Sequence, residues 1–286
     1  MQVITTSQGF NLAVFDTGKT GPTVCISGGV HGNETCGLHA ISMLQQQLLS
    51  GTKLLRGRLF TLIANLEAVR LQKRFIDFDL NRCFHNAYAY GYEAQLAKHL
   101  ASHLVGIDYL LDLHSTSAPT HPFCAGANTI NHLRFFEMLS LEVYTQGWEI
   151  HRQHTMLINE VDRLGGVGII AECGKTGELE TDKVAYCASL HLLQALGMLP
   201  TIEPLVPKTR SFVRIEQIIK ANTEHFYFTR HFKNLDLIKA NEVVAYDGPQ
   251  SISLSQPFLI AMPTQGKLQA GEEAFGVGMV DSIFSA

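Results

Sequence analysis

Three side chains with the chemistry of metal ligands stand at the ends of two apolar runs. His31 and Glu34 lie three residues apart in a glycine-rich turn that follows the run 24–26, and His114 follows the run 110–113. Imidazole nitrogens and carboxylate oxygens are good Zn²⁺ ligands, and a catalytic zinc usually has three protein ligands and a water. Because open α/β sheets place their sites at the carboxyl ends of strands, we predict one Zn²⁺ ion per chain at these residues. Taken alone, the His31–Glu34 spacing also fits an ordinary helix start.

A catalytic zinc also needs a carboxylate that takes a proton from water and delivers it to the leaving group. Glu172 is the best candidate because it ends the run 167–171, which has the pattern of a central buried strand. A charge at such a place is costly unless it has a task or a partner. A salt-bridged core carboxylate is an equally good interpretation of its position alone.

The segment 65–86 has no clean helix or strand period and is dense in Arg, Asp and Asn. Such a segment is an ordered functional loop or a solvated one, and Arg70 and Lys73 fit the second interpretation. The neighbouring Asn81 and Arg82 are harder to dismiss, because an amide beside a guanidinium suits a carboxylate. An oxyanion also requires positive charge or donors. The residues thus predict metal-assisted hydrolysis of an amide that bears a carboxylate.

The elements that must position these residues alternate between strand and helix over the first two hundred residues. The hydrophobic patterns predict strands at 23–28, 59–63, 108–113, 148–150 and 167–171, and helices at 37–49, 92–105, 131–141 and 181–197. This alternation is typical of an α/β fold with a mixed or mostly parallel sheet and helices on both faces.

The pattern changes after a cluster of three prolines, Pro200, Pro204 and Pro207. Beyond it, short alternating or aromatic runs are separated by Gly and Pro turns, which predicts a small β-rich domain. We therefore predict two domains, a catalytic α/β domain at 1–203 and a β-rich domain at 204–286.

Composition excludes several classes of function. The chain has 286 residues, 46% of them hydrophobic, and a net charge of −4, so it offers no basic field for nucleic acid or anionic lipid. No apolar run approaches the ~20 residues that span a bilayer. The six cysteines form no C-x-x-C pair and the N-terminus lacks a signal-peptide pattern, so we predict a cytoplasmic protein.

Four motifs in order resemble the succinylglutamate desuccinylase/aspartoacylase family, which is related to the zinc carboxypeptidases by fold and metal site. They are Gly29-Val-His-Gly-Asn-Glu, Arg74-Phe-Ile-Asp-Phe-Asp-Leu-Asn-Arg, Asp112-Leu-His and Glu172-Cys-Gly. The resemblance covers residues 23–198 well and extends weakly into the tail. It implies a zinc-carboxypeptidase-like mixed sheet flanked by helices, with the tail as a β-rich cap over the site mouth.

The resemblance also implies roles for particular residues. The family's site maps onto the metal ligands His31, Glu34 and His114, the general base Glu172, the carbonyl-polarising Arg74, the carboxylate-binding pair Asn81 and Arg82, and a further substrate-binding arginine at Arg163.

Three departures leave the substrate undetermined. Glu172-Cys-Gly-Lys175 is closer to the desuccinylase Glu-Leu-Gly-Lys than to the aspartoacylase Glu-Val-Gly-Pro, and Ser115-Thr116-Ser117 matches neither group. Phe275 stands in the tail segment where aspartoacylases bring a Tyr. The acyl group and the amino acid both stay open.

We predict a zinc-dependent amidohydrolase that cleaves the acyl amide bond of an N-acyl amino acid, with a metal-bound water and Glu172 as general base. The alternatives are a carboxypeptidase-type peptidase or an esterase on the same metal site, and a non-catalytic zinc or small-molecule binding module. The expected partner is the small-molecule substrate, with no nucleic acid and no membrane, and a homo-oligomer is left open. His39, His151 and His154 are interpreted as packing or surface residues, and Cys173 as a small core residue rather than a nucleophile.

Overall fold

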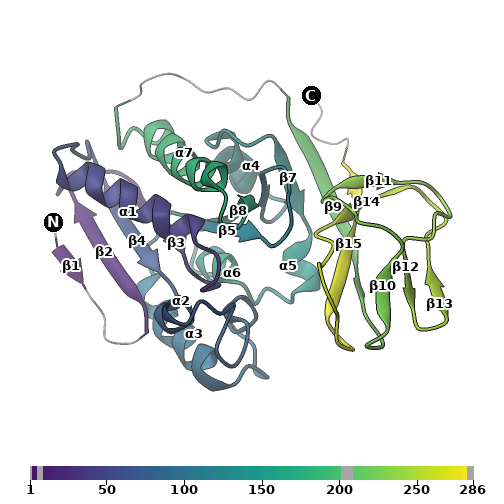
Figure 1. The fold of residues 1–286 in the computed structure, drawn as a ribbon. Coiled ribbons are helices and arrows are strands. Elements are labelled where there is room, and N and C mark those ends of the chain that lie inside the picture. Colours follow the sequence, from purple (N-terminus) through teal and green to yellow (C-terminus); the bar gives the residue numbers. More distant parts are fainter. Residues whose placement is uncertain (1, 5–8, 201–208, 282–286) are drawn as a thin grey trace.

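This computed structural model describes residues 2–4, 9–200 and 209–281. Within them, one sheet of twelve strands runs across the molecule in the order β1-β2-β4-β3-β5-β8-β6-β7-β9-β15-β14-β11 (Figure 1). The strands before residue 200 are β1 (Gln2–Ile4), β2 (Asn11–Asp16), β3 (Thr23–Gly28), β4 (Arg58–Ile63), β5 (Tyr109–Thr116), β6 (Phe123–Ala125), β7 (Val143–Gln146) and β8 (Val167–Lys175). Those of the tail are β9 (Ser211–Lys220), β11 (Asp236–Ile238), β14 (Phe258–Ala261) and β15 (Glu273–Val280).

Helices cover both faces of the first part of the sheet. One face carries α1 (Cys36–Leu49), α4 (Ile130–Glu137) and α7 (Leu179–Ala195), and the other carries α3 (Gly91–His103) and α6 (Leu157–Arg163) (Figure 1). Shorter pieces are α2 (Leu66–Arg70), the 3₁₀ turn η1 (Leu80–Arg82) and α5 (Trp148–His151). Apolar side chains at helical spacing, such as Leu96 and Leu100 of α3, fill the core between layers. In the part of the chain described, no helix is both long and apolar enough to cross a bilayer.

The centre of the sheet is parallel, and its carboxyl edge carries the candidate site. Strands β4, β3, β5 and β8 lie side by side and point the same way. Their side chains are buried on both faces, which explains why β3 and β8 have apolar runs instead of an alternating pattern. Register places His114 of β5 opposite Glu172 of β8, so two predicted site residues come from adjacent strands.

The tail continues the same sheet. Strand β9 pairs in parallel with β7, and β15 pairs with β9 in antiparallel orientation. A second sheet of three strands, β10 (Phe226–Phe228), β12 (Ala245–Asp247) and β13 (Gln250–Ile252), packs beside it around a separate apolar core. The predicted fold class, a mixed sheet flanked by helices with a β-rich C-terminal part, is confirmed. The predicted boundary between residues 203 and 204 lies outside the described residues, so the division into two domains stays a prediction.

One predicted strand is wrong. Residues 148–150 belong to helix α5, and the strand lies just before them as β7. Gly147 separates the two elements with a φ of +95°, and a Cβ there would lie 2.7 Å from the carbonyl oxygen of Ile215 on β9. A short apolar run cannot distinguish strand from helix by its period, and here the tertiary contact decides.

Candidate active site

His31, Glu34 and His114 meet at the carboxyl edge of the parallel strands. His31 and Glu34 lie in the turn between β3 and α1, and His114 lies near the end of β5. One potential ligand atom from each lies within 4.8 Å of the others, and all three residues are buried. The two imidazole rings approach edge to face, with centroids 5.0 Å apart. The three residues become neighbours because β3 and β5 are paired parallel strands.

Close packing of glycine shapes the turn after β3. Gly29 adopts a φ of +68°, which glycine reaches without strain. Gly32 packs against α2 so tightly that a Cβ would lie 2.0 Å from the carbonyl carbon of Ala68. The backbone N–H of Glu34 then donates to the carbonyl of His31 at 3.1 Å, which closes the turn and holds the two ligand-type residues together.

Each imidazole faces Glu34 through Nδ1 and an aspartate through Nε2. The Nδ1 atoms of His31 and His114 lie 2.8 Å and 3.0 Å from the two carboxylate oxygens of Glu34. Their Nε2 atoms lie 3.0 Å from Asp79 and 2.8 Å from Asp112. An aspartate that accepts the Nε2–H fixes the tautomer and leaves the Nδ1 lone pair directed at the centre of the cluster.

The donor set fits a divalent cation. Two Nδ1 lone pairs and a carboxylate that face one another repel unless a cation or protons lie between them. Although burial opposes both shifts, His31 and His114 hold the pKa of Glu34 well below its usual range, and Asp112 and Glu34 hold the pKa of His114 well above its own. Two nitrogens and one oxygen are the three-ligand set typical of a catalytic zinc with an open position.

Arg74 lies against this cluster. Its Nη1 donates to Oε1 of Glu34 at 3.1 Å, and its Nη2 donates to Oδ2 of Asp79 at 3.2 Å. Its side chain is 47% exposed, so the guanidinium is accessible from the cavity described below.

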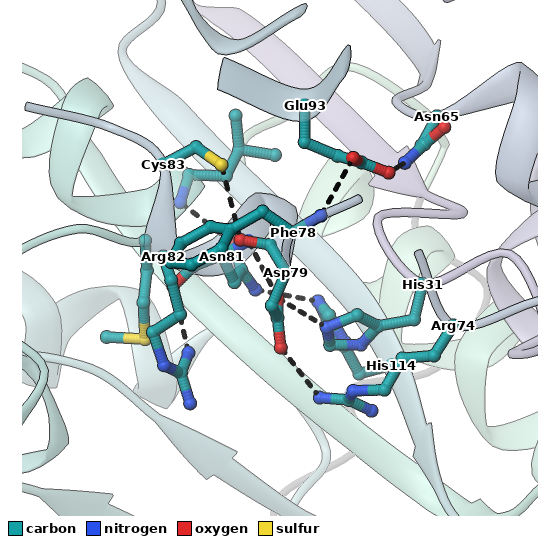
Figure 2. A network of polar contacts seen from close by, with 12 residues as sticks. His31, Asn65, Arg74, Phe78, Asp79, Asn81, Arg82, Cys83, Glu93 and His114 are labelled. Carbon is teal, nitrogen blue, oxygen red and sulfur yellow. Dashed lines mark hydrogen bonds and ion pairs between the residues drawn. The ribbon is translucent and has the colours of Figure 1, made fainter. Parts of the chain in front are cut away.

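A buried carboxylate fixes the loop that carries Arg74, in the segment that the sequence left without a period (Figure 2). Glu93, in the first turn of α3, is fully shielded from solvent. It accepts three consecutive backbone N–H groups of the loop at 2.6, 3.0 and 3.1 Å, those of Ile76, Asp77 and Phe78. It also accepts the side-chain amide of Asn65 at 3.1 Å. The segment is therefore an ordered loop rather than a solvated one.

Asn81 and Arg82 follow in η1. The Oδ1 of buried Asn81 accepts the backbone N–H of Leu157 at 2.9 Å, and its Nδ2 lies 3.5 Å from Nε2 of His114. Arg82 donates to the carbonyl of Asn81 at 2.8 Å and to a carboxylate oxygen of Glu273 at 3.3 Å. The side-chain oxygen of Asn81 is thus engaged in structure, and two nitrogens of Arg82 already donate within the protein, so only the remaining N–H groups of the pair can donate to a ligand.

Glu172 lies beside the same cluster without a partner of its own. Its Oε2 atom is shielded from solvent and has no hydrogen-bond partner among the described residues. Burial, and after it the repulsion of Glu34, raises the pKa of Glu172 to about 7, although His114, His31 and Arg74 oppose the shift. A carboxyl group poised near neutrality can accept and return a proton.

One cavity of about 1030 Å³ joins these residues, with walls from both the first part of the chain and the tail. Seven of the eight predicted site residues line it, and Arg163 does not. Arg163, on α6, instead binds the carboxylate of Glu160 through two hydrogen bonds of 2.6 Å and 3.1 Å. Besides Arg74 and Arg82, the cavity is lined by Arg152, the residue that directly follows α5.

The other residues weighed in the sequence lie away from this chemistry. His39 is on the surface, 2.7 Å from Asp182, and His151 and His154 are exposed. Cys173 is buried, and its contact with the Cys36 thiol and its burial raise its pKa well above the usual range, so it remains a protonated thiol.

More than half of the sequence matches a known family. The sequence model described as "Succinylglutamate desuccinylase/Aspartoacylase catalytic domain" matches residues 20–194. This chain belongs to that family. Among curated members, a succinylglutamate desuccinylase of Burkholderia orbicola is 40% identical over 67 residues, which are 23% of this chain and 20% of the relative. A probable aspartoacylase of Trichodesmium erythraeum is 36% identical over 109 residues, which are 33% of this chain and 36% of the relative.

Solved structures extend the likeness in fold to nearly the whole chain. A succinylglutamate desuccinylase/aspartoacylase of Rhodobacter sphaeroides has a TM-score of 0.73 at 20% identity, over 94% of this chain and 88% of that one. A succinylglutamate desuccinylase of Vibrio cholerae has a TM-score of 0.77 at 18% identity, over 98% and 90%. At such identities the likeness shows the fold alone, tail included, and the two curated alignments span only 20% and 36% of the relatives' length.

Sequence reasoning missed several residues of the site. Asp112 had a signal, because residues two apart on a strand point to the same face and His114 is two residues on. Asp79 stood within a quoted motif but without a role. Glu93 lay in an ordinary helical pattern, and the local sequence around Arg152 carried no sign of a site.

Proposed function

We propose that the chain is a zinc-dependent amidohydrolase that cleaves the acyl amide bond of an N-acyl amino acid. The single observation that carries the proposal is the convergence of three metal-ligand side chains with an unpartnered, shielded carboxylate at one cavity. Membership of the desuccinylase/aspartoacylase family supports the choice of an N-acyl amino acid as substrate.

His31, Glu34 and His114 would hold the ion through Nδ1, a carboxylate oxygen and Nδ1. A bound zinc supplies Lewis acidity, which lowers the pKa of water and polarises a carbonyl group. Asp79 and Asp112 would keep both imidazoles in the ligating tautomer.

Glu172 would accept a proton from the attacking water on its free Oε2 and return it to the leaving nitrogen. A group that performs both transfers needs a pKa near the working pH, and burial provides this for Glu172. The shielded position also strengthens the interaction of its charge with the reacting atoms.

Two arginines would share the charges of substrate and transition state. Arg74 is fixed beside Glu34 and accessible from the cavity, where its guanidinium can stabilise the developing oxyanion. Arg82 and the amide group of Asn81 would bind a substrate carboxylate. Arg163 is not included, because it lies outside the cavity and is engaged with Glu160.

The test combines metal analysis with a substrate panel of succinyl-, acetyl- and formyl-amino acids, matched esters and tripeptides. We expect about one zinc per chain, hydrolysis of at least one N-acyl amino acid, loss of activity with a chelator and recovery with zinc. Preferred hydrolysis of tripeptides or esters would favour the peptidase or the esterase. Bound metal with no turnover of any substrate would favour a non-catalytic binding module.

A pair of histidine variants locates the metal. His114→Asn is expected to lose the ion and the activity together. His39→Asn, which changes an exposed histidine outside the cluster, is expected to retain both. Retention of zinc and activity in the His114 variant would contradict the proposed site.

A further inference from the structure

Glu273, at the start of tail strand β15, bridges two arginines of the cavity wall. Its Oε1 accepts Nη2 of Arg82 at 3.3 Å, and its Oε2 accepts Nη2 of Arg152 at 3.0 Å. The three side chains are 24%, 17% and 31% exposed for Arg82, Arg152 and Glu273, so the cluster lies in the wall and not on the outer surface. A carboxylate of the protein thus occupies the place between two guanidinium groups where a ligand carboxylate would be expected.

The guanidinium group of Arg152 is held by Trp148 as well as by Glu273. Its guanidinium lies over the ring of Trp148, 4.7 Å from the centroid, which fixes the plane of the group. Its buried Nε has no hydrogen-bond partner among the described residues. The unmet donor shows that Glu273 does not exhaust the capacity of this arginine pair.

The net charge of the cluster of Arg82, Arg152 and Glu273 limits how many ligand carboxylates it can bind. Two guanidinium groups and one carboxylate carry a net charge of +1, which one ligand carboxylate neutralises. A second ligand carboxylate would lie next to Glu273 and meet like charge without a cation of its own. Lys220 also lines the cavity, but its side chain is exposed to solvent and its charge acts on Glu273, so it adds little excess positive charge.

Exposed aromatic side chains also line the cavity, alongside its polar and charged residues. Phe75 and Tyr90 are 37% and 61% exposed although both line the cavity, and Phe78 packs against Tyr90 with ring centroids 5.2 Å apart. Exposed aromatic groups that gather at a cavity indicate a surface that an apolar or neutral part of a ligand covers.

We propose that Glu273 is a specificity-determining residue, which takes the place of a second substrate carboxylate and restricts the enzyme to N-acyl amino acids with uncharged side chains. The inference rests on the proposed function and names the substrate class of that site. Its physical basis is the unfavourable juxtaposition of like charges, which rejects a dicarboxylic amino acid while the α-carboxylate still binds Arg82.

The test compares substrates that have the same shape and differ in charge. With an acyl group that the enzyme accepts, N-acyl-glutamine is measured against N-acyl-glutamate, and N-acyl-asparagine against N-acyl-aspartate. We expect the wild type to prefer the amide of each pair by at least about tenfold in kcat/KM, the size of a ~1.4 kcal/mol penalty. Glu273→Gln is expected to reduce this preference by about tenfold or more, mainly by lowering KM for the dicarboxylic substrate.

Glu272→Gln is the matched control. Glu272 also lines the cavity, but its carboxylate accepts the backbone N–H of Gln269 at 2.8 Å and binds neither arginine. It is expected to leave the substrate ratio unchanged, and thermal unfolding of both variants shows whether they fold.

The outcomes separate the two proposals. A wild-type preference for the dicarboxylic substrates, or a Glu273 variant that folds and keeps the wild-type ratio, would overturn the inference and leave the hydrolase function intact. Absence of hydrolysis with every N-acyl amino acid would overturn the proposed function and the inference together.

Discussion

The two walls of the cavity are built by different means. The loop between α2 and α3 is anchored through its backbone, because three N–H groups bind the carboxylate of Glu93, which has no exposed surface. The pairing of β9 with β7 holds the tail on the sheet, but at the cavity the tail meets Arg82 and Arg152 only through side chains, in ion pairs with the partly exposed Glu273.

We relate this difference between the two walls to two tasks of the site, catalysis and the selection of substrate. A backbone held by a buried acceptor keeps its shape when a single side chain on it changes, whereas partly exposed ion pairs contribute little to stability and can be exchanged. The loop carries Arg74, Asp79 and the Asn81–Arg82 pair, whose places the proposed reaction requires to be accurate. We infer that the loop wall serves the reaction and that the tail wall serves the choice of substrate.

The largest effect on kcat is expected for substitution of Glu172, which belongs to neither of the two walls. Glu172→Gln removes the proton acceptor and keeps the shape, so kcat should fall by about 10²–10⁴ while zinc content stays at the wild-type level. Steady-state kinetics and metal analysis on the same preparation measure both. Wild-type turnover in a folded, zinc-loaded variant would remove Glu172 from its role.

The next largest effect is expected on metal affinity. Asp112→Asn weakens the partner that orients His114 and should lower zinc affinity by about 10–100-fold in a chelator competition. Asp162→Asn is the control, since Asp162 binds His132 at 3.1 Å in a similar pair outside the cavity. Equal losses of zinc in both variants would show that Asp112 does not act through the metal ligand.

Removal of the Glu93 carboxylate, which anchors the loop, should have a smaller effect, and it should lower both stability and kcat/KM. Glu93→Gln replaces one acceptor oxygen by a donor, which leaves buried N–H groups unmet and should cost about 1–3 kcal/mol of unfolding free energy. Because the loop carries Arg74, kcat/KM should also fall by about tenfold. Glu67→Gln, at an exposed glutamate of α2 paired with Arg70, should change neither quantity measurably. An active-site effect of Glu67→Gln as large as that of Glu93→Gln would contradict the comparison.

The smallest effect on catalysis is expected at Arg163. Arg163→Ala removes a partner of Glu160 outside both walls, so the unfolding temperature should decrease while kcat/KM stays within about twofold. Arg152→Gln instead removes a partner of Glu273 in the tail wall and should raise KM more than it lowers kcat. A larger rise of KM in the Arg163 variant would return that residue to the substrate site.

The sequence alone predicted the site residues that lie near the ends of strands and in turns. The apolar runs located strands β3, β5 and β8, although β5 and β8 continue past the predicted ends at 113 and 171 to Thr116 and Lys175. Parallel pairing brought His31, His114 and Glu172 to one edge. Spacing also marked Asn81 and Arg82 as a pair. These residues lie near strand ends and in turns, and short stretches of sequence indicate both.

The remaining features depend on contacts between distant segments. Arg152 reaches the cavity because α5 replaces the predicted strand at 148–150, and its partner Glu273 lies 121 residues away on β15. Strand β9, which joins the tail to the sheet, has a mixed burial pattern and stood outside the predicted elements. Neither composition nor period reports such pairings, because the partner supplies the decisive contact.

The parallel pairing of β9 with β7 has a mechanical consequence. Backbone hydrogen bonds join Val143–Gln146 to the first residues of β9, and the side chain of Gln146 donates to Asp281 at 2.7 Å. A movement of the C-terminal part away from the helices would break these hydrogen bonds. The entrance of the cavity therefore has a fixed width. We therefore expect substrates to enter and products to leave by diffusion through an entrance that stays open. Small side-chain adjustments are the only motion required.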